Sequence, residues 1–161
     1  MNLTFRTEPK ESDMKSIHDI VESTKFFYDH EIDIAVELVT EALNLGQEAT
    51  GYYFVFAEVD GVVAAYSCFG PISMSKTCFD LYWIATHNDF RGKGIGKKLL
   101  EETYIIAREM GCKIIIAETS GLPHYAPTRA FYDSTEFTLE ARLKDFYDMG
   151  DDKLFYTKRI G

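Results

Sequence analysis

Hydrophobic and polar positions alternate at the start of the chain and then follow a helical period. Leu3 and Phe5 alternate with polar neighbours, which predicts a short strand. Apolar residues then recur every three or four positions over residues 14–21 and 32–43. This spacing predicts two amphipathic helices, the second of which ends near Gly46.

The middle of the chain has the pattern of strands followed by a helix. Residues 52–58 and 62–69 are apolar, aromatic and β-branched runs, and the dipeptide Asp60-Gly61 between them predicts a tight hairpin. Residues 78–86 predict a third strand of this group. A helix follows it with one face formed by Ile95, Leu99, Thr103, Ile106 and Met110, and a left-handed cap at Gly111 is expected to end it.

The last third begins with a fully apolar run, residues 114–117, of the kind buried on both faces of a sheet. It follows the preceding strand through a helix, so the two strands should be parallel. A short helix over residues 128–134 and two strands over residues 137–146 and 153–159 complete the pattern. We therefore predict one α/β (α+β) domain over residues 1–161, with a mixed, mostly antiparallel sheet of about seven strands and about four helices.

Composition and charge narrow the classes of function. A net charge of −9 opposes binding to a phosphate backbone, so no nucleic-acid partner is expected. The three cysteines, at positions 68, 78 and 112, have neither disulfide-framework nor zinc-site spacing, and no metal is expected. No apolar run has the length of a signal peptide or a membrane span, which favours a cytoplasmic protein without a membrane partner.

A glycine-rich turn lies between the strand at residues 78–86 and the helix expected to begin at Lys97. Its sequence is Arg91-Gly92-Lys93-Gly94-Ile95-Gly96. Backbone N–H groups at a helix N-terminus and nearby cations favour an anion, and glycines let the backbone approach phosphate oxygens closely. The turn therefore predicts a phosphate-binding site.

Two nucleotide-binding motifs fail against this spacing. A Walker A loop needs Gly at position 91 and Ser or Thr at position 98, where this chain has Arg91 and Lys98. A dinucleotide fingerprint needs Gly at position 97, which is Lys97. The turn belongs to neither class.

The same segment resembles motif A of the GNAT superfamily of N-acetyltransferases, whose pattern is [R/Q]-x-x-G-x-[G/A]. Arg91, Gly94 and Gly96 match it position for position, after the strand segment at residues 80–85. Residues 128–132 are similar to the motif B helix with its Phe-Tyr pair, and residues 145–153 are similar to a prokaryotic branch of the family whose substrates are unassigned. One departure is Glu136-Phe137, where family members commonly have Gly-Phe.

The resemblance implies the GNAT fold, splayed between strands 4 and 5, with acetyl-CoA bound in the splay. It implies that the turn holds the pyrophosphate and that the end of the preceding strand pairs with the pantetheine arm. It also implies that Tyr132 protonates the departing thiolate. The expected cofactor-binding residues are Ile84, Ala85, Thr86, Arg91, Gly92, Lys93, Gly94, Ile95, Gly96, Lys97 and Thr128.

The expected reaction is transfer of an acetyl group from acetyl-CoA to a primary amine of a small molecule or peptide, by direct attack in a ternary complex. The amine must first lose a proton, for which Asp80, Tyr82, Glu118 or a water relay are alternatives. A non-catalytic acyl-CoA-binding regulatory module is the alternative function. An exposed edge strand near residues 145–156 is compatible with a homodimer.

Overall fold

The computed structural model describes all residues from Met1 to Gly161. It contains a mixed sheet of seven strands in the order β1-β2-β3-β4-β5-β7-β6, which confirms the predicted α/β class. Contacts gather in two compact units, residues 1–70 with 83–106 and residues 71–82 with 107–161, and the single domain stays a prediction.

The first unit carries most of the helices. In chain order its elements are β1 (Leu3–Arg6), α1 (Asp13–Ser23), α2 (Asp29–Leu45), α3 (Gln47–Thr50), β2 (Tyr53–Val59), β3 (Val62–Pro71), the end of β4 (Cys78–Thr86) and most of α4 (Ile95–Glu109). The short helix α3, between Gly46 and the left-handed Gly51, is absent from the prediction and makes five helices instead of about four.

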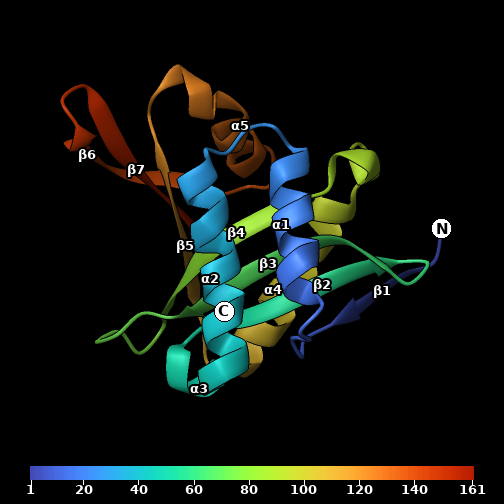
Figure 1. Ribbon diagram of the computed structural model, residues 1–161. Helices are drawn as coiled ribbons and strands as arrows, with labels where there is room; N and C mark the ends of the chain where they lie inside the picture. The colour runs from blue at the N-terminus through green and yellow to red at the C-terminus, as the bar shows by residue number, and fades with distance from the viewer. The chain divides into compact units, whose positions relative to one another are not determined.

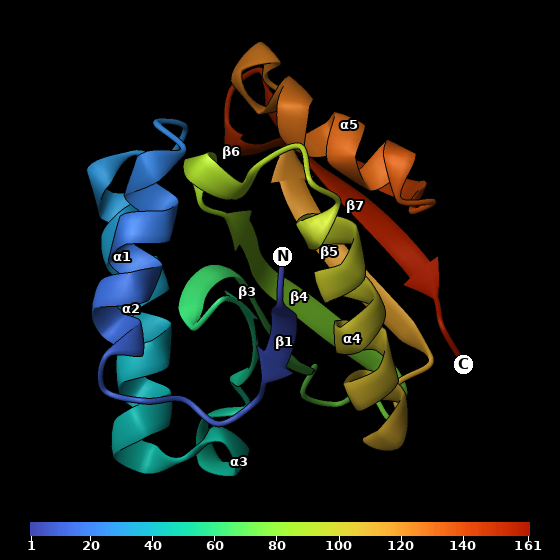
Figure 2. The same ribbon diagram turned by 90° about the vertical axis from the view of Figure 1, so that its right-hand side faces the viewer.

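The turn between β2 and β3 has the backbone angles of the hairpin that the sequence predicted. Asp60 and Gly61 have φ angles of 51° and 85°, so both occupy the left-handed region that a tight hairpin requires. β2 pairs with β3 and β1 with β2, in both cases antiparallel. Helices α1 and α2 lie side by side over one face of these strands, and α4 lies over the opposite face (Figures 1 and 2).

A buried ion pair ties β1 to α1. The Arg6 guanidinium donates to both carboxylate oxygens of Asp13, each at 2.8 Å, and Asp13 is fully buried. Arg6 also contacts Glu58 on β2 at 3.2 Å and lies 4.5 Å from the centre of the Phe56 ring. Phe56 belongs to the core that the apolar faces of α1 and α2 cover, so this ion pair fixes the edge of that core.

The second unit contains the start of β4, β5 (Ile114–Ser120), α5 (Ala126–Ser134), β6 (Thr138–Asp148) and β7 (Asp151–Arg159). β5 pairs with β7 and β7 with β6, both antiparallel. β4 and β5 are parallel, as predicted, but they pair only where Cys78–Asp80 faces Ile114–Ile116. Both strands continue beyond this short ladder, and this is the expected splay.

Two details of the second unit differ from the sequence pattern. Met110 lies beyond the end of α4, because the chain already turns into the left-handed Gly111 there. Ile114 and Ile116 are only half-buried, so β5 is deeply buried on one face and not on both.

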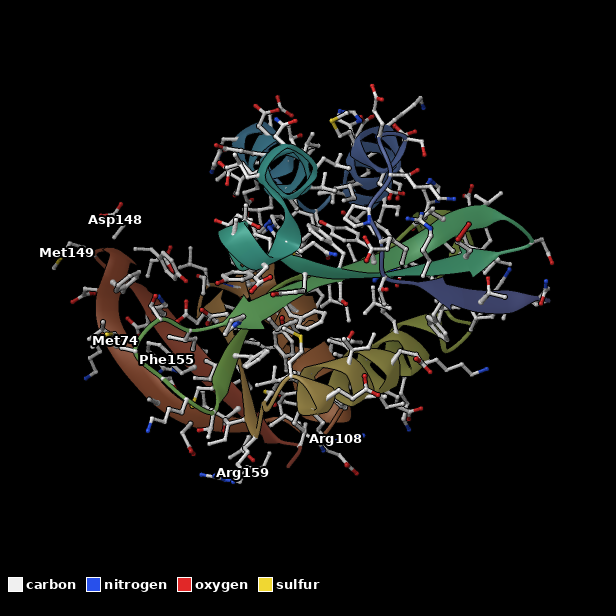
Figure 3. All side chains as sticks on the ribbon, turned by 90° about the horizontal axis from the view of Figure 1, so that it is seen from below. Met74, Arg108, Asp148, Met149, Phe155 and Arg159 are labelled. Atoms are coloured by element: carbon white, nitrogen blue, oxygen red, sulfur yellow. The ribbon has the colours of Figure 1, made fainter.

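Strand β6 forms the edge of the sheet, and all of its residues are exposed. Its ladder with β7 contains two register shifts, between Leu139 and Ala141 and between Leu143 and Asp148. Asp148 and Met149 lie at the tip of the hairpin, while Phe155 lies along β7 (Figure 3). No helix of the structure is both long enough and apolar enough to span a bilayer.

Candidate active site

The glycine-rich turn has the backbone geometry of an anion cradle. Gly92 and Gly94 have φ angles of 75° and 76°, and a Cβ atom added at either would meet nothing within 4 Å. A side chain there would thus be strained in backbone conformation and would project into open space. The glycines keep this space clear at the end of a helix.

Helix α4 begins at Ile95, two residues earlier than predicted. The Lys98 N–H donates to the Gly94 carbonyl at 3.2 Å, which makes Gly94 the residue that precedes the helix. The N–H groups of Ile95, Gly96 and Lys97 therefore belong to the first turn, where an α-helix leaves its donors without partners within the helix. These donors point out of the helix end, where the dipole favours negative charge.

Cations surround the turn, and no acidic residue lies in the first turn of α4. Arg91, Lys93, Lys97 and Lys98 are all exposed. The Lys93 ammonium lies 5.6 Å from the ring centre of Phe90, which ends the short 3₁₀ turn before the glycines. Because the protein as a whole is acidic, this local concentration of positive charge distinguishes the turn from the rest of the first unit.

The end of β4 carries the residues expected to contact a cofactor arm through the main chain. Ala85 is buried and packs into the core beneath α1 and α2, whereas Ile84 and Thr86 are half-buried. The His87 N–H donates to the Ala64 carbonyl at 2.8 Å, so the end of β4 is fixed to β3. The ladder with β5 has already ended at Asp80.

Tyr132 and Thr128 lie on α5 in the second unit. Tyr132 is 6% exposed and its ring lies 5.1 Å from that of Phe137 and 5.5 Å from that of Tyr156. Burial raises the pKa of the Tyr132 phenol, so the hydroxyl keeps its proton far above neutral pH. The phenol is therefore in the protonated state that a general acid requires, and it does not act as a base in that state.

Helix α5 is followed by a residue in the left-handed region, at the position where the sequence has Glu136-Phe137. Glu136 has a φ of 68°, in the left-handed region, and the Phe137 N–H donates to the Tyr132 carbonyl at 3.0 Å. Glu136 therefore occupies a backbone conformation that favours glycine. The left-handed conformation costs roughly 1–2 kcal/mol for a residue with a Cβ atom.

Arg129 is a positioning residue that the sequence analysis did not identify. Its guanidinium donates to the Ser120 carbonyl at 2.8 Å and to the Leu122 carbonyl at 2.9 Å. These bonds attach α5 to the end of β5. Arg129 lies inside the motif B segment, but nothing in the sequence indicates which carbonyls its side chain reaches.

The three candidates for the general base have different surroundings. Glu118 is paired with the Lys153 ammonium at 2.8 Å, and Tyr82 is 38% exposed. Asp80 is half-buried, and its pKa is raised to about 6, first by burial and then by the negative charge of Glu118, against an opposing effect of Lys153. Of the three, Asp80 has a pKa suited to accept a proton near neutrality.

The thiols have surroundings that suppress ionisation. Cys68 is fully buried, and burial raises its pKa. Burial also raises the pKa of the Cys112 thiol to about 11. Neither thiol is therefore a thiolate at neutral pH, the form in which cysteine acts as a nucleophile.

A cavity of about 630 Å³ opens between the end of α1 and the start of α2. Its lining combines apolar Phe27 and Ile32 with Glu22, Asp29 and Asp33, together with His18 and Lys25. The nearby Glu31 caps α2, because its carboxylate accepts the Tyr28 N–H at 3.0 Å.

Comparisons with known proteins identify the family to which this chain is similar. A family model described as the acetyltransferase (GNAT) family matches residues 14–137. A crystal structure of a GNAT-family protein from Desulfovibrio desulfuricans is 42% identical, with a TM-score of 0.95 over 99% of this chain and 100% of the other. A comparison with curated protein sequences gave no match.

More distant structures share the fold and contain the cofactor. A Salmonella typhimurium protein crystallised with its cofactor acetyl-CoA is 21% identical, with a TM-score of 0.72 over 100% of this chain and 95% of the other. An aminoglycoside 6′-N-acetyltransferase complexed with coenzyme A is 15% identical, with a TM-score of 0.77 over 100% and 98% of the two chains. The extent of the family match, with the splayed sheet and the glycine turn, shows that the chain belongs to the GNAT family of acetyltransferases.

Proposed function

We propose that this protein transfers an acetyl group from acetyl-CoA to a primary amine of a small molecule or peptide, by direct attack of the amine in a ternary complex. The observation that carries the proposal is the turn at the start of α4. There, two left-handed glycines, open space and free helix-end donors coincide with exposed cations. The related structures that hold acetyl-CoA or coenzyme A support the choice of cofactor.

The chain offers main-chain groups and cations for each polar part of such a cofactor. We propose that the N–H groups of residues 92–97 bind the pyrophosphate, with Arg91 and Lys97 adding charge. The main chain of Ile84, Ala85 and Thr86 would bind the pantetheine arm, and Thr128 would contribute from α5. Acetyl-CoA, when bound, supplies an acetyl group activated as a thioester.

Asp80 is our choice for the general base. An alkyl ammonium group has a pKa near ~10.4 and must lose a proton before its nitrogen can attack. A base works best when its own pKa lies near the working pH, and the pKa of about 6 at Asp80 meets this condition. Glu118 is less suited, because its charge is already paired with Lys153.

Direct attack is favoured over a covalent relay through Cys68 or Cys112. The raised pKa values of Cys68 and Cys112 leave these thiols protonated and unreactive at neutral pH. The acidic cavity between α1 and α2 further supports an amine acceptor, since its three carboxylates attract a cation. Tyr132, which is protonated at neutral pH, is our choice for the acid that protonates the departing thiolate.

Substitution of Gly94 by glutamate is the first test. The added carboxylate would repel the phosphates, and the φ of 76° would strain any side chain. We expect acetyl-CoA affinity to fall by up to about 30-fold, since a charge at a helix end contributes up to ~2 kcal/mol. Titration calorimetry of the wild-type protein and the Gly94→Glu variant measures this loss.

Gly61→Glu is the matched control for this experiment. Gly61 also has a positive φ, 85°, and open space for a Cβ atom, but it lies in the β2–β3 hairpin. The same charge and a similar backbone strain are thus added away from the turn, and affinity should remain at the wild-type level. Equal binding by wild type and Gly94→Glu would refute the cofactor site.

Thiol release in the presence of an amine panel then tests the reaction. The panel should contain aminoglycosides, diamines and short peptides with free amino groups. Release of free coenzyme A with any of them would establish an acetyltransferase and name its acceptor class. Tight acetyl-CoA binding without release from any amine would instead favour the regulatory binding module.

A further inference from the structure

We infer that Lys153 is a positioning residue, which holds Glu118 as an ionised partner beside Asp80 and thereby leaves Asp80 as the proton acceptor. The inference rests on the proposed function, because it assigns roles within that reaction. It concerns the second unit alone, where all three side chains belong to strands β4, β5 and β7.

Strand register places the three residues on one face. Asp80 on β4 is opposite Ile116 on β5, and residues 116, 118 and 120 of β5 share a face because side chains alternate along a strand. Ser120 is opposite Lys153 on β7. Opposed residues on paired strands point to the same face, so Asp80, Glu118 and Lys153 form one polar row across three strands.

The ammonium of Lys153 is held on two sides. Its Nζ atom lies 2.8 Å from the Glu118 carboxylate, 4.2 Å from the centre of the Phe146 ring and 5.3 Å from that of Phe155. The side chain is 14% exposed, against 37% for Glu118. A cation over aromatic rings and against a carboxylate is stabilised by both, which restrains the Lys153 side chain in this position.

This arrangement gives the two carboxylates different roles. The Glu118 carboxylate is paired with the Lys153 ammonium, whereas Asp80 has no ion-pair partner of its own and is half-buried. Burial and Glu118 raise the pKa of Asp80, and Lys153 lowers it, so Lys153 moderates the effect of Glu118.

Other titratable groups face the row. Tyr147, near the end of β6, is 47% exposed, and its pKa is raised first by partial desolvation and then by Glu118 and Asp151. Cys78 and Tyr82 lie on the same strand face as Asp80 by alternation. The charges that act on Asp80 are those of Glu118, which raises its pKa, and Lys153, which lowers it.

Opposite substitutions should move the titration of Asp80 in opposite directions. Lys153→Met keeps the apolar stem on the aromatic rings and removes the positive charge, so the pKa of Asp80 should rise above about 6. Glu118→Gln removes the negative charge that raises this pKa, so the value should fall. A ¹³C NMR titration of the aspartate carboxyl groups, with Asp80 assigned from an Asp80→Asn variant, measures both shifts without turnover.

The pH–rate profile gives a second readout of the same groups. Because a base must be ionised, the wild-type kcat/KM at pH 6 should be about half of its alkaline plateau. Lys153→Met should lower this fraction and Glu118→Gln should raise it. Lys153→Arg keeps the cation and should restore the wild-type profile.

Lys158→Met is the matched control on the same strand. Lys158 is also paired with a glutamate, Glu136 at 3.3 Å, but that carboxylate is 85% exposed and does not act on Asp80. The variant should leave the titration of Asp80 and the pH profile unchanged.

The inference fails if the Asp80 titration is the same in the wild type, Lys153→Met and Glu118→Gln proteins. It also fails if Glu118→Gln abolishes turnover while Asp80→Asn does not, since Glu118 would then be the base. These outcomes are separate from loss of the proposed function, because acetyl-CoA binding at the glycine turn is measured by calorimetry on other residues.

Discussion

Replacement of Tyr132 by phenylalanine is expected to lower kcat by about 10²–10⁴-fold, the usual contribution of a general acid. The buried phenol is protonated at neutral pH, which is the state that a general acid needs before it protonates a departing thiolate. Phenylalanine keeps the ring between Phe137 and Tyr156, so the substitution removes the hydroxyl without leaving a cavity. Acetyl-CoA affinity should be nearly unchanged.

Steady-state kinetics on an accepted amine, with calorimetry on the same samples, measure this effect. Tyr156→Phe is the control, because Tyr156 is buried in the same aromatic cluster and loses the same atom. That variant should retain kcat. If Tyr132→Phe also retained kcat, the acid would have to be another group, and Tyr132 would be an ordinary core aromatic residue.

Replacement of Asp13 by alanine is expected to lower the free energy of unfolding by about 3–5 kcal/mol. The carboxylate is fully buried. It accepts one hydrogen bond from Arg6 at each oxygen and a further one from the Lys10 N–H at 2.6 Å. Without it, the Arg6 guanidinium remains largely buried against Phe56 with Glu58 as its remaining carboxylate partner. Loss of one partner leaves the other charge poorly compensated.

Urea unfolding followed by circular dichroism tests this expectation. Asp19→Ala is the control, since Asp19 forms an exposed ion pair with Lys15 within α1, and exposed pairs contribute little. If Asp13→Ala unfolded at the same urea concentration as the wild type, the buried ion pair between Arg6 and Asp13 would add no net stability to β1 and α1.

The features that the sequence predicted well are those set by neighbouring residues. The hairpin at Asp60 and Gly61, the cap at Gly111 and the turn between β4 and α4 each depend on a few consecutive residues with special backbone angles. The parallel β4–β5 step was also predicted, because a strand, helix and strand in succession have few ways to pack.

The features that the sequence did not predict depend on residues far apart in the chain. Lys153 and Glu118 meet only because β5 and β7 pair in one register. Asp80 was one of several equal candidates for the base until the neighbouring charges were known. The aspartates of the cavity likewise depend on how α1 and α2 pack, which a helical period alone does not specify.

The raised pKa of Asp80 has a consequence for proton binding during folding. An unfolded aspartate titrates at 3.8, whereas Asp80 in the folded chain titrates at about 6, so between these values the folded state holds a proton that the unfolded state has released. Folding in this range takes up hydrogen ions at this position. The contribution to stability is greatest below pH 3.8 and is lost as the pH rises through 6. Asp19 and Asp152, whose pKa values are lowered, act in the opposite sense and favour the folded state at higher pH. At neutral pH, Asp80 is thus the carboxylate best suited to accept a proton, and its ionised form lowers the stability of the folded state.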